Sequence, residues 1–309
     1  MKNLIKKFKK QIFNVHLILI ALIILISLPG KKSVQSYDAL LIGIGIIEMF
    51  YLYHLFLAYK KEKPSEASSD IMVIILIFLF IWEILTTKLN LMHPVLIPAP
   101  EDVFNVFINQ YKTLLEGVVY SLKLLLIGFF FGLTLGVSLG LIVGWVPRLK
   151  GIFYPIANVI TPIPPVVFAP YLIAIMPTFR SASALVILLG IFFPTFLNMI
   201  IQVDSMDYRI LESAKALNLN SHTMILNILF PYVLPRVVSG LKVSLTTSVM
   251  MLTFAEMMGA TKGMGFYIIN YTHYANYTNV VAGIIVIGAV VTILNWIVSN
   301  IQIRVIKWR

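Results

Sequence analysis

Side chains able to carry out covalent chemistry are scarce in this sequence. Its 309 residues include no cysteine, which excludes disulfides, thiolate metal sites and cysteine nucleophiles. There is no Gly-x-x-x-x-Gly-Lys phosphate-binding loop, no acidic pair at a usable spacing and no Ser/His/Asp signature in a supporting context. His54 and His273 lack a second ligand at metal-binding spacing. We therefore predict that this chain is not an enzyme and binds no metal or cofactor of its own.

The most informative polar stretch, Asp204–Thr223, has the pattern of a short amphipathic helix. Four apolar residues are expected to share one face of that helix: Ile210, Leu211, Ala214 and Leu217. The charged positions are Asp207, Arg209, Glu212 and Lys215. A helix of this kind either docks on a partner protein or lies as an ordinary amphipathic segment on the membrane surface.

Two asparagines and two prolines predict how this helix ends and the next one begins. Asn218 stands where a left-handed residue would end the first helix, and Asn220 is a favourable N-cap for a second helix. Pro231 and Pro235 then bend the chain before the next apolar run. The sequence therefore predicts two short helices joined by a turn, which together form a docking knob.

Two further candidates lie within or beside apolar runs. A cluster of four prolines either kinks a packed helix or breaks the backbone where it lines a substrate path at membrane depth. Its members are Pro162, Pro164, Pro165 and Pro170. Glu256, near the outer end of a predicted span, is a candidate for the same path, although solvation at the membrane interface would also explain it.

Isolated charges occur in other apolar runs. Glu48 lies near the middle of one run, where a charge is costly and is usually paired, protonated or functional. We expect a structural role for Glu48, or a role in contacting a partner. Lys123 and Lys242 are expected to extend toward the interface or to pack along the helices.

A stripe of small residues predicts close contact between two helices. Gly132, Gly136 and Gly140 repeat every four residues, which places them on one face of a helix. We interpret this stripe as a packing surface within the chain.

The elements that position these residues are membrane-spanning helices. Hydrophobic residues make up 59% of the chain and charged residues 12%, which leaves too little polar surface for a water-soluble protein of this size. Backbone groups cannot stay unpaired in lipid, and the apolar runs are continuous, so we predict an all-α polytopic membrane protein and no β-barrel. The eight expected spans are approximately 12–28, 37–59, 71–87, 117–146, 152–176, 182–203, 224–257 and 280–303.

Basic residues predict the orientation of the chain. The net charge of +11 is spread over short loops rather than along a stripe with interleaved aromatic residues, so we predict no nucleic-acid partner. An even number of spans puts both termini on one side, which holds 15 Lys and Arg residues against 6 on the other. Those six are Lys31, Lys32, Lys88, Lys112, Arg180 and Lys262. We therefore predict a multi-pass protein of the cell membrane with both termini in the cytoplasm.

The first two spans are set apart from the rest. The polar stretch Lys60–Asp70 predicts a cytoplasmic linker after them. The basic N-terminus resembles a signal peptide, but residues 27–30 make a poor cleavage site, so we expect a retained helix.

Several short motifs resemble those of one transporter family. Binding-protein-dependent ABC importer permeases carry a Glu-Ala-Ala, Gly, Leu-Pro, Pro and Gly-Leu pattern, and the matching positions are Glu212-Ser213-Ala214, Asn218, Pro231, Pro235 and Gly240-Leu241. The likeness extends to Ile97-Pro98-Ala99-Pro100, Tyr154-Pro155, Pro164-Pro165, Phe254-Ala255-Glu256-Met257 and Gly263-Met264-Gly265-Phe266. Together these motifs look like the nitrate, sulfonate and taurine branch, over roughly residues 71–303. Met176-Pro177-Thr178-Phe179-Arg180 departs from the family, which commonly has Gly-x-Gly-Glu there.

The resemblance implies a type I importer core of six helices at 71–309, preceded by a two-helix extension at 1–70. In that family a cytoplasmic helix pair, here at about 204–223, docks in a cleft of the ATPase subunit and transmits nucleotide-driven closure to the pore. Carried over by position, the ATPase-coupling residues are Glu212, Ser213, Ala214, Leu217, Asn218, Pro231 and Gly240. The substrate-path candidates are Pro164, Pro165 and Glu256.

The resemblance also implies partners. They are two ABC ATPase subunits that use ATP and Mg, a second permease copy in a homodimer, an extracytoplasmic solute-binding protein and membrane lipid. The implied solute is small: nitrate, a sulfonate, taurine or a pyrimidine vitamin precursor. Two alternatives stay open, namely a secondary transporter driven by an ion gradient through acids such as Glu48 and Glu83, and a scaffold or receptor without transport.

Overall fold

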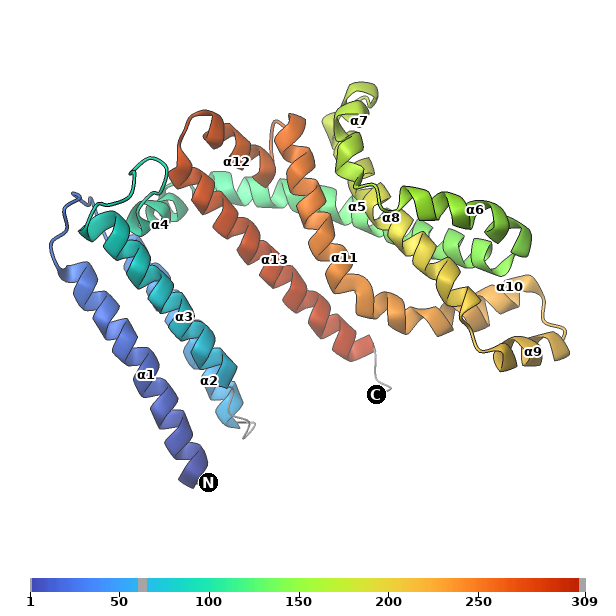
Figure 1. Ribbon diagram of the computed structural model, residues 1–309, viewed down its shortest axis with the longest axis horizontal. Helices are drawn as coiled ribbons and strands as arrows, with labels where there is room; N and C mark the ends of the chain where they lie inside the picture. Colours follow the sequence, from blue (N-terminus) through green and yellow to red (C-terminus); the bar gives the residue numbers. More distant parts are fainter. Residues whose placement is uncertain (1, 61–65, 306–309) are drawn as a thin grey trace. The chain divides into compact units, whose positions relative to one another are not determined.

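The computed structural model describes residues 2–60 and 66–305, and these residues are almost entirely helical (Figure 1). In chain order the elements are α1 (Lys2–Ser27), α2 (Asp38–Lys60), α3 (Glu66–Glu83), the π-helix η1 (Ile84–Lys88), α4 (Pro100–Asn109), α5 (Tyr111–Trp145), α6 (Pro147–Ile160), the 3₁₀-helix η2 (Pro165–Phe168), α7 (Ala169–Ile175), α8 (Phe179–Asp204), α9 (Tyr208–Ala216), α10 (Ser221–Thr223), the π-helix η3 (Met224–Leu229), α11 (Phe230–Gly259), α12 (Met264–His273) and α13 (Tyr277–Val305). Packing divides the chain into two compact units, Met1–Thr113 with Asn270–Ile284, and Leu114–Ile269 with Ile285–Arg309.

Helices suited to crossing a membrane account for the apolar runs. Within the described residues, six helical segments are long and apolar enough: Asp38–Ala58, Ala67–Lys88, Tyr111–Trp145, Phe179–Asp204, Ser221–Gly259 and Tyr277–Arg304. A further candidate is the pair Pro147–Ile160 and Pro165–Ile175, and Ile12–Ser27 is a shorter apolar helix. The six helices and the bent pair coincide with seven of the eight predicted spans, and the shorter helix Ile12–Ser27 lies at the position of the first. The predicted all-α polytopic fold is therefore confirmed.

In the first unit, α1, α2 and α3 pack around an apolar core, and α4 contacts α2 and α3. The most deeply buried members of this core are Val15, Leu22, Leu40 and Leu76. Glu48 of α2 faces α1, where its Oε1 lies 3.4 Å from Nε2 of His16. This contact within one pair of helices supports the structural role predicted for Glu48.

A buried polar cluster closes one end of the first unit. Lys88 donates a hydrogen bond to the carbonyl oxygen of Leu28 at 2.6 Å, and its Nζ lies 3.5 Å from Oε1 of Glu83. Thr87 donates to Oε1 of Glu101 at 2.8 Å. These contacts connect the end of α1 with η1 and α4, so the polar residues in this part of the chain hold neighbouring elements together.

The linker predicted at Lys60–Asp70 is wrong in its second half, because α3 begins at Glu66. Ser69 is buried in this helix, and its Oγ lies 3.2 Å from the hydroxyl oxygen of Tyr51 in α2. Hydrogen bonding satisfies the serine, so a serine-rich composition does not interrupt the helix here. Residues 61–65 of the predicted linker lie outside the described residues. The boundary of the N-terminal extension at residue 70 stays a prediction.

In the second unit, α5 and α8 approach closely along the glycine stripe. A methyl group at Gly132 would lie 2.8 Å from the carbonyl oxygen of Leu188, and one at Gly140 would lie 2.8 Å from that of Phe196. Any residue larger than glycine would push the two helices apart. The predicted packing within the chain is confirmed, and the stripe continues to Gly128 and Gly144.

The helices α11 and α13 complete the second unit. An apolar core joins α5 and α8 to α11 and α13, with Leu125, Ile187 and Leu252 among its buried residues. Gln302 of α13 donates a hydrogen bond to the carbonyl oxygen of Val238 in α11 at 2.7 Å. Figure 1 shows α11 changing direction along its length, as expected for a helix with a proline, Pro235, inside it.

Candidate functional site

A short helix pair follows the end of α8 and forms the predicted knob, α9 and α10 (Figure 1). Lys150 of α6 forms an ion pair with Asp204, the last residue of α8. The Oδ1 atom of Asp207 accepts a hydrogen bond from the backbone N–H of Arg209 at 2.9 Å, which caps the start of α9. The segment therefore begins at a fixed point on the helical bundle.

The turn between α9 and α10 has the predicted geometry. Asn218 has φ 48°, a left-handed conformation that asparagine tolerates better than most residues. The N–H of Leu219 reaches back to the carbonyl oxygen of Ala214 at 3.3 Å, the bond of a Schellman motif. Asn220 accepts a hydrogen bond from the N–H of Thr223 at 2.8 Å and so caps α10. Both predictions for these asparagines are confirmed.

The apolar face predicted for α9 is wrong in part. Ala214 is only 5% exposed and belongs to an apolar cluster with Met206, Met224, Leu229 and Val233. Ile210 is 39% exposed and Leu217 72% exposed. The reason is that α9 ends at Ala216, so Leu217 lies in the turn instead of on the helix. The structure does not describe the side chain of Leu211.

The remaining residues assigned to the knob divide between its surface and α11. Glu212 and Ser213 are exposed on α9, where Ser213 donates a hydrogen bond to the carbonyl oxygen of Arg209 at 2.8 Å. Pro231 is exposed in the first turn of α11. Gly240 lies farther along α11, where a methyl group would meet no atom within 4 Å. The structure therefore gathers Glu212, Ser213, Leu217 and Asn218 on the knob, whereas Pro231 and Gly240 belong to α11.

Glu256 is buried in a cluster of hydrogen bonds, which we call the clasp. Its side chain is 1% exposed, so solvation at the membrane interface does not explain it and that interpretation is wrong. Ser121 of α5 donates a hydrogen bond to Oε1 at 2.7 Å, and the N–H of Gly265 donates to Oε2 at 2.8 Å. The N–H of Met264 donates in turn to Oγ of Ser121 at 2.9 Å. The carboxylate thus joins α5 and α11 to the N-terminus of α12, where the helix dipole favours an anion.

Two glycines make room for this carboxylate. Gly263 has φ 111°, and a methyl group there would lie 2.4 Å from Oε1 of Glu256. A methyl group at Gly265 would lie 2.3 Å from the carbonyl oxygen of Thr253. The Gly-x-Gly motif is therefore required by the close approach of the backbone to Glu256.

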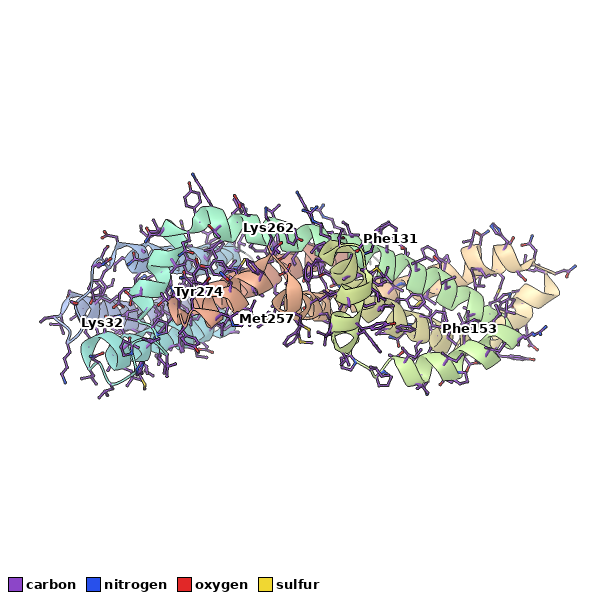
Figure 2. The ribbon with its side chains drawn as sticks, turned by 90° about the horizontal axis from the view of Figure 1, so that it is seen from above. Lys32, Phe131, Phe153, Met257, Lys262 and Tyr274 are labelled. Atoms are coloured by element: carbon purple, nitrogen blue, oxygen red, sulfur yellow. The ribbon has the colours of Figure 1, made fainter. Side chains whose placement is uncertain are left out.

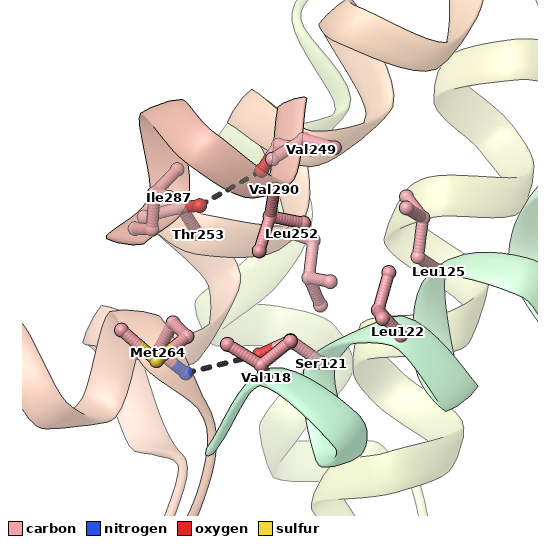
Figure 3. Close-up of a pocket in the computed structure, with 10 residues that line it drawn as sticks. All are labelled: Val118, Ser121, Leu122, Leu125, Val249, Leu252, Thr253, Met264, Ile287 and Val290. Carbon is pink, nitrogen blue, oxygen red and sulfur yellow. Dashed lines mark hydrogen bonds between the residues drawn. The ribbon is translucent and has the colours of Figure 1, made fainter. Parts of the chain in front are cut away.

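A small apolar cavity of about 30 Å³ lies beside the clasp (Figure 3). Figure 3 shows the hydrogen bond between Met264 and Ser121 at one end of it and the one between Thr253 and Val249 at the other. The volume matches that of about one water molecule. Both oxygens of Glu256 are occupied by donors from this chain, which favours a positioning role, and its assignment to the substrate path stays a prediction.

The proline cluster breaks its helix. The two halves, Pro147–Ile160 and Pro165–Ile175, are bent by 81° relative to one another. Pro164 is exposed, whereas Pro165 approaches α8, with its Cγ 3.6 Å from a methyl group placed at Gly190. A break of this size favours irregular backbone over a simple kink. The assignment of Pro164 and Pro165 to a substrate path stays a prediction.

Comparison with known protein families accounts for this combination of helices. Residues 132–307 match the family described as binding-protein-dependent transport system inner membrane component. The chain belongs to this family. It is a permease of the ABC importer type and a multi-pass protein of the inner membrane. The match includes α9, the proline break and Glu256.

Individual relatives agree with the family. The permease is 25% identical to the taurine transport system permease protein of Escherichia coli K12 over 239 residues, which are 75% of this chain and 86% of that protein. It is 24% identical to the nitrate import permease protein of Synechocystis over 243 residues, which are 76% of this chain and 88% of that protein. Among solved structures, the MetNI methionine ABC transporter in inward-facing conformations matches with a TM-score of 0.56 and 19% identity, covering 64% of the permease and 99% of that chain. This last likeness concerns the fold alone.

Sequence reasoning missed the partners of Glu256 in this permease. Ser121 precedes Glu256 by 135 positions, and no local pattern connects them. The Gly263-Met264-Gly265 motif was the available indication, since paired glycines commonly mark a close backbone approach.

Proposed function

We propose that this permease serves an ATP-driven importer, and that α9 and α10 are the coupling helices that dock on a separate ATPase subunit. The observation that carries the proposal is that α9 and the turn after it have a buried side and an exposed side. Ala214 is buried against the bundle, while Glu212, Ser213 and Leu217 are exposed around the left-handed turn at Asn218. An exposed leucine in the turn that follows a helix with an exposed carboxylate is suited to a partner's cleft.

The packing behind α9 supports transmission of motion into the membrane. Met206 follows the end of α8, and Met224 begins η3, which leads into α11. Both lie in the same apolar cluster as Ala214. When the ATPase closes on nucleotide, a push on α9 would therefore reach α8 and α11 together. Because packed helices respond as rigid elements, this push would switch the bundle between inward and outward access.

The remaining parts of the proposal concern the assembly. We place both termini and α9 in the cytoplasm, on the basis of the Lys and Arg distribution. Two ATPase subunits using ATP and Mg would then act on a permease homodimer. An extracytoplasmic binding protein would deliver a small solute, and the names of the taurine and nitrate relatives support a small anion.

The structure offers less support for transport driven by an ion gradient. That alternative relied on Glu48 and Glu83 as intramembrane acids. Each lies close to a basic side chain of its own unit, Glu48 3.4 Å from His16 and Glu83 3.5 Å from Lys88. A basic neighbour therefore stands beside each acid, while the carboxylate oxygens of both accept no hydrogen bond among the described residues.

The test is co-purification of the tagged permease with the ATPase subunit encoded beside it. Ala214→Arg is unsuitable because Ala214 is buried. Leu217→Asp changes an exposed side chain in the knob, and Leu91→Asp is its matched control because Leu91 is 66% exposed outside the knob. We expect the wild type and Leu91→Asp to retain the ATPase and Leu217→Asp to lose it.

If the wild type and both variants recover the ATPase equally, α9 is not the docking element. Recovery with none of them, together with uptake that persists without ATP, would favour the gradient-driven alternative.

A further inference from the structure

A groove of about 650 Å³ in the second compact unit is lined by basic side chains. Lys123 comes from α5, Arg180 from the first turn of α8, and Lys262 from the loop between α11 and α12, where Figure 2 labels it. We call these three residues the groove cations. Glu116 also lines the groove, so three positive charges and one negative charge leave a formal charge of +2.

The groove cations are not neutralised by ion pairs. None of the three lies within salt-bridge distance of an acidic side chain in the part of the chain that the structure describes. Of the four other basic residues on the same predicted side of the membrane, two are paired: Lys32 with Asp102, and Lys88 with Glu83. The groove therefore gathers on its wall three positive charges that are unpaired among the described residues.

Membrane topology does not explain this positive charge. The predicted outer side carries few Lys and Arg residues, as the positive-inside rule requires, yet Arg180 and Lys262 lie there and face one groove. The N-terminus of α8 adds positive potential next to Arg180. The guanidinium carbon of Arg180 lies 5.3 Å from the ring centre of Tyr120, which restricts the arginine to the groove wall.

We propose that this groove is a binding site for a small oxyanion that carries a short apolar tail. Arginine offers two parallel N–H donors to a sulfonate, carboxylate or phosphate, and lysine adds a mobile point charge. The other walls are apolar, with Leu115, Val119 and Ile127, and they suit an alkyl chain. Lys123, expected from sequence to extend toward the interface or to pack along the helices, becomes part of this proposed site.

Two sources supply this chemistry, a free organic anion such as an alkylsulfonate and the phosphate headgroup of a membrane lipid. A role of the groove in collecting solute for import rests on the proposed function. Binding of the oxyanion does not rest on it.

The test is isothermal titration calorimetry on the full-length permease in dodecyl maltoside, with ethanesulfonate and with dioctanoyl phosphatidylglycerol as separate probes. The double variant Arg180→Gln with Lys262→Gln removes two groove cations. Lys31→Gln with Lys112→Gln is the control, since it removes two exposed charges from the same predicted side outside the groove. Arg180→Lys with Lys262→Arg keeps the charge and checks that the fold tolerates substitution.

At least one probe should bind the wild type and the control equally, and should bind the double glutamine variant about tenfold more weakly or worse. The charge-conserving variant should retain most of the affinity. Binding of ethanesulfonate without competition from the lipid identifies a solute site, and binding of the lipid alone identifies a headgroup site.

The proposal is overturned if neither probe binds, or if the double glutamine variant binds as tightly as the wild type. These outcomes concern the isolated permease, so they are independent of ATPase docking. A permease that binds ethanesulfonate through the groove but recruits no ATPase would overturn the proposed function and leave the groove assignment intact.

Discussion

The clasp around Glu256 and the knob at α9 use the same kinds of residue for opposite purposes. Each combines a glutamate, small residues and a left-handed backbone position. In the clasp, Glu256 is 1% exposed and both carboxylate oxygens accept hydrogen bonds from the chain itself. On the knob, Glu212 is exposed and Leu217 is 72% exposed.

The difference shows that a family motif does not by itself say which way its residues face. Ala214 and Glu212 stand two positions apart in one motif, yet the first packs inward and the second faces outward. The inward residues fix the shape of the permease, and the outward ones remain available to a partner. Substitutions should therefore divide into those that lower stability and those that change only association.

The largest effect is expected from removing the carboxylate of Glu256. The variant Glu256→Ala loses two charge-assisted hydrogen bonds and leaves the donors of Ser121 and Gly265 buried without their acceptor. We expect a loss of about 3 kcal/mol or more in the free energy of unfolding, measured by denaturant titration in dodecyl maltoside. The exposed Glu212→Ala should change it by less than about 0.5 kcal/mol. Equal effects for the two variants would contradict the comparison.

The next effect is expected at the buried side of the knob. The variant Ala214→Leu adds three carbon atoms to a residue that is 5% exposed, so the free energy of unfolding should fall by about 2 kcal/mol. The matched control is Ala216→Leu, on the exposed end of the same helix, and it should have little effect. If Ala214→Leu retains full stability in the same titration, α9 does not pack on the bundle as described.

The sequence predicted the positions of the helices in this permease better than it predicted which side chains are buried or exposed. Apolar runs located the six helices that are long enough to cross a membrane and the bent helix pair, because the membrane requires long stretches of one character. Asn218 and Asn220 were predicted correctly because their capping depends on only a few neighbouring residues. The exposure of Leu217 was missed because helical periodicity assumes that α9 continues, whereas it ends at Ala216.

The break at the prolines and the clasp around Glu256 were less accessible to sequence reasoning. Four prolines indicated an irregularity, but its angle of 81° depends on how α6 and α7 pack against α8. The partner of Glu256 on α5 lies far away in sequence, so only the tertiary structure brings Ser121 to it. Such contacts carry no periodicity that a single sequence displays.

A smaller effect tests the turn of the knob. Asn218 has φ 48°, a left-handed conformation that asparagine tolerates better than alanine because its short polar side chain can hydrogen-bond locally, so Asn218→Ala should lower the free energy of unfolding by about 1 kcal/mol. Asn218→Gly removes the Cβ atom, which is strained at this φ, and should be neutral or slightly stabilising. Thermal unfolding of both variants in the same detergent is the measurement. If glycine destabilises as much as alanine, the side chain of Asn218 matters for a reason other than its backbone conformation.

The smallest effect on stability is expected at Leu217, and it separates the two regions most clearly. This side chain is 72% exposed and belongs to no buried cluster among the described residues, so Leu217→Ser should change the free energy of unfolding by less than about 0.5 kcal/mol. The same variant should weaken co-purification with the ATPase, because serine removes apolar surface from the proposed contact. If Leu217→Ser lowers both the free energy of unfolding and co-purification with the ATPase, Leu217 belongs with the inward residues. Loss of association alone would show that the permease has a surface reserved for its partner.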